Sequence, residues 1–123
     1  MDETKKLLIV DDEETLTFSL YQCFILAKQN YEVVTAGSGI EAWEKINREK
    51  FDLVISDIRM PGMDGLELLE QIKKHYPHLE VIIMTAFGSD DKKEEAMRKG
   101  ARFYLEKPFE MKEIRQLVMD ILK

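Results

Sequence analysis

Five reactive side chains follow short apolar segments that lie far apart in the chain. They are Asp11 and Asp12 after LLIV, Asp57 after LVIS, Thr85 at the end of VIIMT, and Lys107 after FYLE. Carboxylates that lie close together repel one another, and a hard divalent cation such as Mg²⁺ relieves that repulsion because it prefers oxygen ligands. A carboxylate can also accept a phosphoryl group. A metal ion, an ammonium group and a hydroxyl group can then bind the phosphoryl oxygens.

This set predicts Mg²⁺-dependent phosphoryl transfer to Asp57 only if the fold brings the five side chains together. Taken singly, each has a structural explanation: the adjacent acids could stabilise a helix start, Thr85 could simply end a strand, and Lys107 could lie in solvent. The elements that position the five residues therefore decide between the two interpretations.

Five short apolar segments, at residues 7–10, 32–36, 53–56, 81–85 and 102–106, are predicted to be strands. The first, third and fourth are almost continuous Leu, Ile and Val, which is typical of strands covered on both faces. Segments of helical length and period separate the strands, so we expect a parallel sheet with helices on both faces. Ligands of such sheets bind beyond the carboxyl ends of the strands, where four of the five predicted strands deliver the reactive side chains.

Several residues indicate where the helices begin and end. Capping-box spacing, which is typical of a helix start, occurs twice, in Ser38 with Glu41 and in Asp64 with Glu67. Ser89 and Asp90 are expected to cap the fourth helix, and Asn30 and Gly100 are expected to end helices. Ile40 and Trp43 are expected on the core face of the second helix.

Length and composition exclude several classes of protein. The 123 residues fit one domain, residues 1–123, and 45% hydrophobic with 34% charged residues is typical of a globular chain. The net charge is −6 and Lys and Arg are not clustered, so we expect no direct nucleic-acid binding. No apolar run approaches the roughly 20 residues of a membrane span. Cys23 is the one cysteine, which suits a reducing compartment, so a cytoplasmic location is expected.

Four segments together resemble the response regulator receiver domains of two-component systems. They are LLIVDDE at 7–13, SDIRMPGMDG at 56–65, IIMTA at 82–86 and GARFYLEKPF at 100–109. The resemblance covers essentially the whole chain, and the MTAFG stretch is more similar to NtrC-type regulators than to CheY. It implies a flavodoxin-like, doubly wound (βα)5 fold of the α/β class, with a five-stranded parallel sheet in the order 2-1-3-4-5. It also implies a signalling domain that is not an enzyme and promotes only its own phosphorylation and dephosphorylation.

The resemblance assigns the acceptor and metal sites residue by residue. It implies that Asp57 takes a phosphoryl group from a sensor histidine kinase or a histidine phosphotransfer protein. It implies that Asp12 and Asp57 bind Mg²⁺ directly, that Asp11 acts largely through water, and that the Arg59 backbone carbonyl adds a ligand.

The resemblance also implies how a bound phosphoryl group is sensed. Lys107 would pair with the phosphoryl oxygens, and the peptide between Lys107 and Pro108 would be cis. Thr85 and Tyr104 would form a switch pair, in which the hydroxyl of Thr85 moves toward the phosphate and the Tyr104 ring turns inward.

Two surfaces are expected to carry the signal to partners. In the predicted fourth helix only Ala96 and Met97 are apolar, so packing holds it weakly and it can shift when phosphorylation adds charge. With the last strand and last helix it would form the face that controls an output domain or effector, as in the family, for transcription regulation. A second apolar stripe on the first helix, Phe18, Tyr21 and Ile25, is either scattered surface or a contact for a kinase helical bundle or a second copy of this chain.

Other functions remain as alternatives. A free-standing CheY-like or phosphorelay regulator would act by protein contact alone. An Mg²⁺-dependent aspartyl-phosphate hydrolase would need a second acid and a substrate pocket, and the Asp-x-Asp pattern of haloacid dehalogenases is absent. A receiver fold that no longer accepts phosphate usually lacks an acid, the Lys or the Thr. A flavodoxin needs a phosphate loop after the first strand, where the acids from Asp11 to Glu14 would repel the phosphate of FMN.

Overall fold

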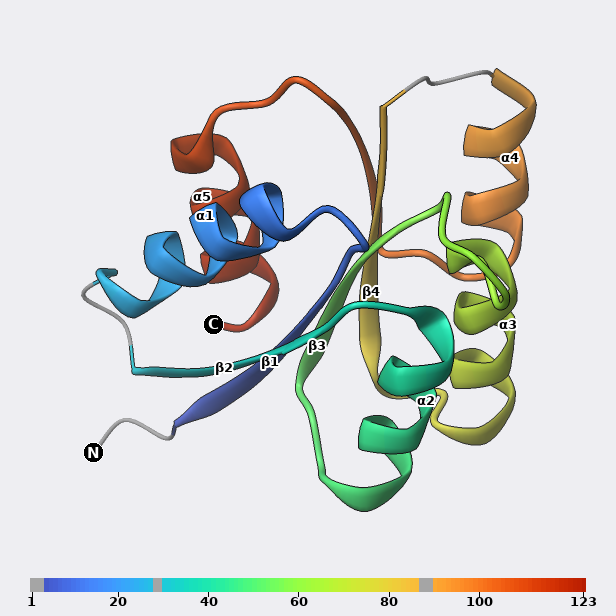
Figure 1. The fold of residues 1–123 in the computed structure, drawn as a ribbon, viewed down its shortest axis with the longest axis horizontal. Coiled ribbons are helices and arrows are strands. Elements are labelled where there is room, and N and C mark those ends of the chain that lie inside the picture. The colour runs from blue at the N-terminus through green and yellow to red at the C-terminus, as the bar shows by residue number, and fades with distance from the viewer. Residues whose placement is uncertain (1–3, 28–29, 87–89) are drawn as a thin grey trace.

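The computed structural model of the chain describes residues 4–27, 30–86 and 90–123, and within them strands and helices alternate (Figure 1). The elements in chain order are β1 Lys5–Val10, α1 Glu14–Ile25, β2 Tyr31–Ala36, α2 Gly39–Arg48, β3 Leu53–Asp57, α3 Gly65–His75, β4 Glu80–Thr85, α4 Asp90–Arg98, β5 Phe103–Glu106 and α5 Met111–Ile121. Among these residues, no helix combines the length and the apolar character that crossing a membrane requires.

The five strands form one parallel sheet in the order β2-β1-β3-β4-β5, so the predicted fold class and strand order are confirmed. Helices α1 and α5 cover one face of the sheet, and α2, α3 and α4 cover the other (Figure 1). The strand order places β1 and β3 side by side at the centre, with Val10 opposite Ser56. The residues that follow these two strands therefore emerge next to each other.

Each central strand contributes alternate side chains to two separate cores. In β1, Leu7 and Ile9 pack with α1 and α5, whereas Leu8 and Val10 pack with the helices on the other face. All four are fully buried, and burying each such side chain contributes about 1.5–3 kcal/mol to folding. A strand that is apolar on both faces is therefore held firmly, and it fixes the position of the residues that follow it.

The capping predictions are confirmed at two helices. The Ser38 side chain accepts a hydrogen bond from the Glu41 amide at 3.1 Å. At the start of α3, Asp64 accepts from the Glu67 amide at 2.8 Å, and Glu67 accepts from the Asp64 amide at 3.2 Å. Gly100 has a φ of 104° just beyond α4, as expected of a helix end. The predicted cap of α4 at Ser89 and the Asp90 side chain lies outside the described residues.

Two predictions about helix ends and faces are wrong. Helix α1 ends at Ile25, well before Asn30, because the Asn30 carbonyl already accepts a hydrogen bond from the Lys5 amide and so belongs to the start of the sheet. Ile40 is 54% exposed and lies outside the core, whereas Trp43 is partly buried and packs on it. Ile40 is in the first turn of α2, where it meets the loop around Gly62 and not the sheet.

Candidate functional site

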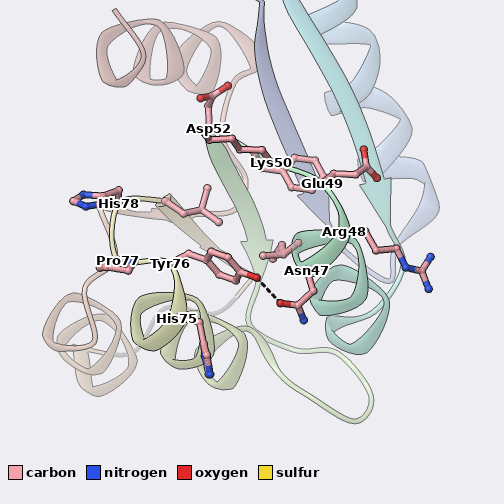
Figure 2. A pocket seen from close by; sticks show the side chains of 12 residues that line it. Asn47, Arg48, Glu49, Lys50, Asp52, His75, Tyr76, Pro77 and His78 are labelled. Carbon is pink, nitrogen blue, oxygen red and sulfur yellow. Dashed lines mark hydrogen bonds between the residues drawn. The ribbon is translucent and has the colours of Figure 1, made fainter.

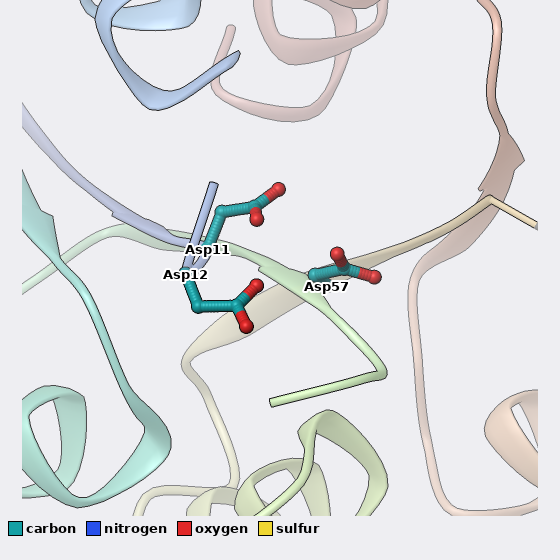
Figure 3. A group of neighbouring side chains, drawn as sticks. All are labelled: Asp11, Asp12 and Asp57. Carbon is teal, nitrogen blue, oxygen red and sulfur yellow. The ribbon is translucent and has the colours of Figure 1, made fainter. Parts of the chain in front are cut away.

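Three carboxylates converge where the two central strands end (Figure 3). Asp11 and Asp12 follow β1, and Asp57 is the last residue of β3. One carboxylate oxygen from each lies within 4.8 Å of the others. Asp11 and Asp57 are buried, with 2% and 7% of their surfaces exposed, whereas Asp12 faces solvent. The arrangement presents concentrated negative charge at a partly open edge of the sheet.

A lysine from a third strand end completes the cluster. The Lys107 ammonium lies 3.0 Å from Asp57 Oδ2 and 3.2 Å from Asp11 Oδ2. The loop that carries it is anchored to β4, because the Lys107 amide donates to the Thr85 carbonyl at 2.8 Å. The peptide between Lys107 and Pro108 is cis. One ammonium group thus bridges two carboxylates that come from different strands.

Backbone amides fix the orientation of the two buried acids. Asp11 Oδ1 accepts a hydrogen bond from the Glu13 amide at 2.8 Å, and Asp57 Oδ1 accepts one from the Ile58 amide at 2.7 Å. The Ile58 carbonyl in turn accepts from the Gly65 amide at 2.8 Å, which ties the Asp57 turn to the start of α3. These contacts leave the second oxygen of each acid to Lys107.

The charges in the cluster are not balanced. Burial raises the pKa of the Asp11 carboxyl above its usual value and the Asp57 charge adds to this, while the Glu13 amide and Lys107 act in the opposite direction. Burial alone would lower the pKa of Lys107, but its hydrogen bond to Asp57 and the charge of Asp11 outweigh burial and raise it. Three carboxylates against one ammonium leave an excess of negative charge that favours a hard cation with oxygen ligands.

The two residues of the expected switch pair lie beside this cluster. Thr85 ends β4 and is 4% exposed, and Tyr104 of β5 is 8% exposed. The Tyr104 hydroxyl is buried without completing a hydrogen bond. Burial raises the pKa of Tyr104, and the nearby Thr85 hydroxyl opposes part of that rise. The aromatic ring is thus already inside the protein in this structure.

A cavity of about 580 Å³ adjoins the acidic cluster and contains a residue that sequence reasoning did not place there. Its lining includes Asp12, Arg59 and Lys92. The family resemblance places the Arg59 backbone carbonyl near the metal. The sequence predicts α4 as a weakly held helix beside the site and as part of an output face, but it does not single out Lys92 of that helix. No local sequence signal links Lys92 to Asp12, because their proximity depends on how α4 packs beside the loop that follows β3.

Comparisons with known proteins agree on one family. The family model described as the response regulator receiver domain matches residues 7–119. The response regulator protein FleR of Pseudomonas aeruginosa is 46% identical over 92% of this chain, which spans 24% of FleR. Sporulation initiation phosphotransferase F of Bacillus subtilis is 38% identical over 96% of this chain, which spans 94% of that protein. Chemotaxis protein CheY4 of Vibrio cholerae superposes with a TM-score of 0.89 at 30% identity, over 97% of this chain and 99% of CheY4.

Proposed function

We propose that this chain, which belongs to the response regulator receiver domain family of two-component systems, accepts a phosphoryl group on Asp57 in a reaction that requires Mg²⁺. The phosphodonor would be a histidine of a sensor kinase or of a histidine phosphotransfer protein. The phosphorylated domain would then act as a signal and not as an enzyme with an external substrate. Asp57 is suited to the role because it is held at the end of a central strand and its carboxylate reaches the open edge of the sheet.

The acidic cluster fits a magnesium ion. The excess of carboxylate over ammonium charge and the oxygen-only donor set both suit a hard divalent cation. Asp12 and Asp57 would bind it directly, with Asp11 acting through water and the Arg59 carbonyl completing the protein ligands. When bound, Mg²⁺ would neutralise part of the negative charge and hold an oxygen of the incoming phosphoryl group.

The side chains of this domain would carry out the remaining steps. A carboxylate oxygen of Asp57 attacks the phosphorus of a phosphohistidine, so that a P–O bond forms and the P–N bond breaks, and the electron pair leaves with the imidazole ring. Lys107, already 3.0 Å from Asp57, would turn from the carboxylate to a phosphoryl oxygen. The Thr85 hydroxyl would donate to another phosphoryl oxygen, which stabilises the charge of the product.

One observation carries the proposal: the Lys107 ammonium contacts both Asp11 and Asp57, although the three residues lie far apart in the sequence. Convergence of three strand ends on one point is difficult to explain by helix capping or by solvated loops. It is the arrangement that a carboxylate needs if it is to hold a phosphoryl group and the cation that accompanies it.

Incubation with acetyl phosphate and Mg²⁺, followed by intact mass measurement and site mapping, tests the proposal. We expect the mass of one phosphoryl group to be added to the wild-type chain and to Asp120→Asn, a control on the exposed face of α5. We expect Asp57→Asn to show no such addition. Addition to Asp57→Asn at the wild-type rate would mean that another residue is the acceptor.

The output is a separate proposal. FleR is a longer response regulator, whereas sporulation initiation phosphotransferase F is about the length of this chain, so the relatives include both kinds. We place the output on α4, β5 and α5, acting on an attached domain or an effector that regulates transcription, with self-association of the phosphorylated chain as one route. A cytoplasmic location is proposed on the basis of the free thiol of Cys23.

A further inference from the structure

Two cavities of similar volume lie at opposite ends of the sheet. One, of about 590 Å³, opens between the α2–β3 loop and the α3–β4 loop, where the Tyr76 hydroxyl donates to Asn47 Oδ1 at 2.6 Å (Figure 2). Both of these loops precede strands, so this cavity is remote from the acidic cluster. The other, of about 580 Å³, lies beside Asp12 where the strands end. Other parts of the fold can therefore respond to the charge of the acidic cluster at the second cavity.

Three parts of the fold meet around the second cavity. Asp12 follows β1, Arg59 lies in the loop that follows β3, and Lys92 is the third residue of α4. Charges that line one cavity of this volume lie within about 10 Å of one another, which is the Debye length at about 0.1 M ionic strength. They therefore interact across the cavity, and more strongly in less salt. Of the two cations, Arg59 lies on a loop between β3 and α3, whereas Lys92 moves with α4.

Within α4 itself, Lys92 contributes little stability. A cation in the first turn of a helix lies near the positive end of the helix dipole, which is unfavourable. The ion pair of Lys92 with Glu95 is long, at 3.9 Å, and the Lys92 side chain is 52% exposed, so this pair contributes little. The helix therefore gives no strong reason for a positive charge at position 92, whereas the acidic cluster across the cavity gives one.

Helix α4 is anchored near its C-terminal end. Ala96 is fully buried in the core that α2 and α3 also cover. Just beyond the helix, the Lys99 ammonium lies 2.7 Å from Glu70 Oε2 on α3. Toward the other end of the helix, residues 91–94 are all exposed. A charge that attracts or repels Lys92 therefore acts on the end of α4 that packing holds least.

We propose that Lys92 is a positioning residue that couples the charge of the acidic cluster to the exposed end of α4. This inference rests on the proposed function, because Mg²⁺ and the phosphoryl group are the charges that change. A divalent cation at Asp12 repels the Lys92 ammonium, and the negative charge of a phosphoryl group attracts it. Coupling is reciprocal, so if bound Mg²⁺ weakens the packing of this end of α4, Lys92 weakens Mg²⁺ binding by the same factor.

Titration with MgCl₂ alone measures the effect of Lys92 on the acidic cluster without any phosphodonor. The amide NMR shifts of Asp12 and Ile58 report the binding. We expect Lys92→Gln to bind Mg²⁺ about two- to threefold more tightly than the wild type at about 10 mM ionic strength. The difference should vanish in about 1 M NaCl, where the Debye length is about 3 Å. Lys92→Arg keeps the charge and should bind Mg²⁺ as the wild type does.

Lys93→Gln is the matched control. Lys93 is the next residue of the same helix and is also exposed, but it does not line the cavity. The control removes the same charge from α4 and should bind Mg²⁺ nearly as the wild type does. Equal Mg²⁺ affinity of Lys92→Gln and the wild type, or an equal gain in Lys93→Gln, would overturn the role of Lys92.

Amide hydrogen exchange tests the coupling to the helix. Relative to Mg²⁺ alone, beryllofluoride with Mg²⁺ should slow exchange at Glu94 and Glu95, which lie beyond the first turn of α4. Lys92→Gln should lose most of this effect, and an undiminished effect would overturn the coupling. Lys92→Gln should still accept a phosphoryl group on Asp57 from acetyl phosphate. A wild-type chain that accepts no phosphoryl group would contradict the proposed function instead, so the two failures are distinguishable.

Discussion

At the scale of single residues, the acidic cluster stores unfavourable electrostatic energy. Asp11 is almost completely buried and lies close to a second buried carboxylate, and one ammonium group compensates both. Burying a charge costs free energy unless it is fully paired, and this pairing is shared. The repulsion within such a site costs free energy of folding, and a bound cation would relieve it.

Asp11→Asn is therefore expected to stabilise the metal-free protein. Asparagine keeps the oxygen that accepts from the Glu13 amide, and it removes a buried charge that Asp57 repels. We expect a gain of about 1 kcal/mol, which corresponds to roughly 3–6 °C in the melting temperature for a domain of this size. The melting temperatures of the variant and the wild type, measured with EDTA, give this gain. A second measurement with Mg²⁺ should show that the ion raises the melting temperature of the variant less than that of the wild type. If the variant had a lower melting temperature than the wild type without metal, this would contradict the repulsion between Asp11 and Asp57.

The free energy of unfolding gained by Asp11→Asn should depend on pH. Because the pKa of Asp11 is raised in the folded state, the folded protein binds more protons than the unfolded chain between the usual aspartate value, about 3.9, and the raised value. Stability contributed by the protonated form is lost as the pH rises through this window. The advantage of Asp11→Asn should thus be small near pH 4 and should grow as the pH rises through this window, as measured by urea unfolding without metal. An advantage that is equal at both pH values would show that charge is not its cause.

At the scale of secondary-structure elements, the start of α3 holds the acceptor loop in place. Gly65 is the first residue of α3 and is buried against the backbone of Asp57. A Cβ atom at position 65 would lie 2.0 Å from the Asp57 carbonyl oxygen and 2.9 Å from the Ile58 Cα atom. The close approach of this helix to β3 therefore requires glycine.

Gly65→Ala is expected to destabilise the fold by about 3 kcal/mol or more, because backbone must move to admit the methyl group. Gly37→Ala is the matched control, since its added Cβ would meet only the Glu41 Oε1 atom at 3.7 Å. The control should stay within about 0.5 kcal/mol of the wild type. Urea unfolding of both variants provides the measurement, and equal midpoints would contradict the close packing of α3 on β3.

At the scale of the whole molecule, α4 is the element best placed to link the acidic cluster to a surface. Among its residues whose side chains are described, Ala96 is buried and Met97 is 45% exposed. Its Lys92 lines the cavity beside Asp12, so one end of the helix reaches the site. An element with few buried apolar contacts opens at low free-energy cost.

Beryllofluoride with Mg²⁺, an acyl-phosphate mimic, is expected to change amide hydrogen exchange in α4 and β5. The added negative charge near Lys92 and Thr85 shifts the balance between arrangements of a weakly held helix. Amides of α3 beyond its first turn, such as Ile72, should change little, and Asp57→Asn should abolish the response. Unchanged exchange throughout α4 in the wild-type protein would contradict its role in output.

Local patterns in the sequence determined the strands, the starts of α2 and α3 and the direction of the sheet. Leu7 to Val10 and Leu53 to Ile55 are apolar on both faces, so their burial follows from residue type alone. The parallel arrangement then places the residues that follow these strands at one edge, and for this reason the sequence alone groups Asp11, Asp12 and Asp57.

Tertiary structure alone decided which side chains touch. It brought the Lys107 ammonium to two carboxylates, buried the Tyr104 ring, exposed Ile40, ended α1 before Asn30 and formed the cavity beside Tyr76. The physical reason is the separation in sequence of the residues that determine each feature. Burial of a strand depends on the apolar character of its own residues, whereas each of these contacts depends on the packing of elements that are distant in the chain.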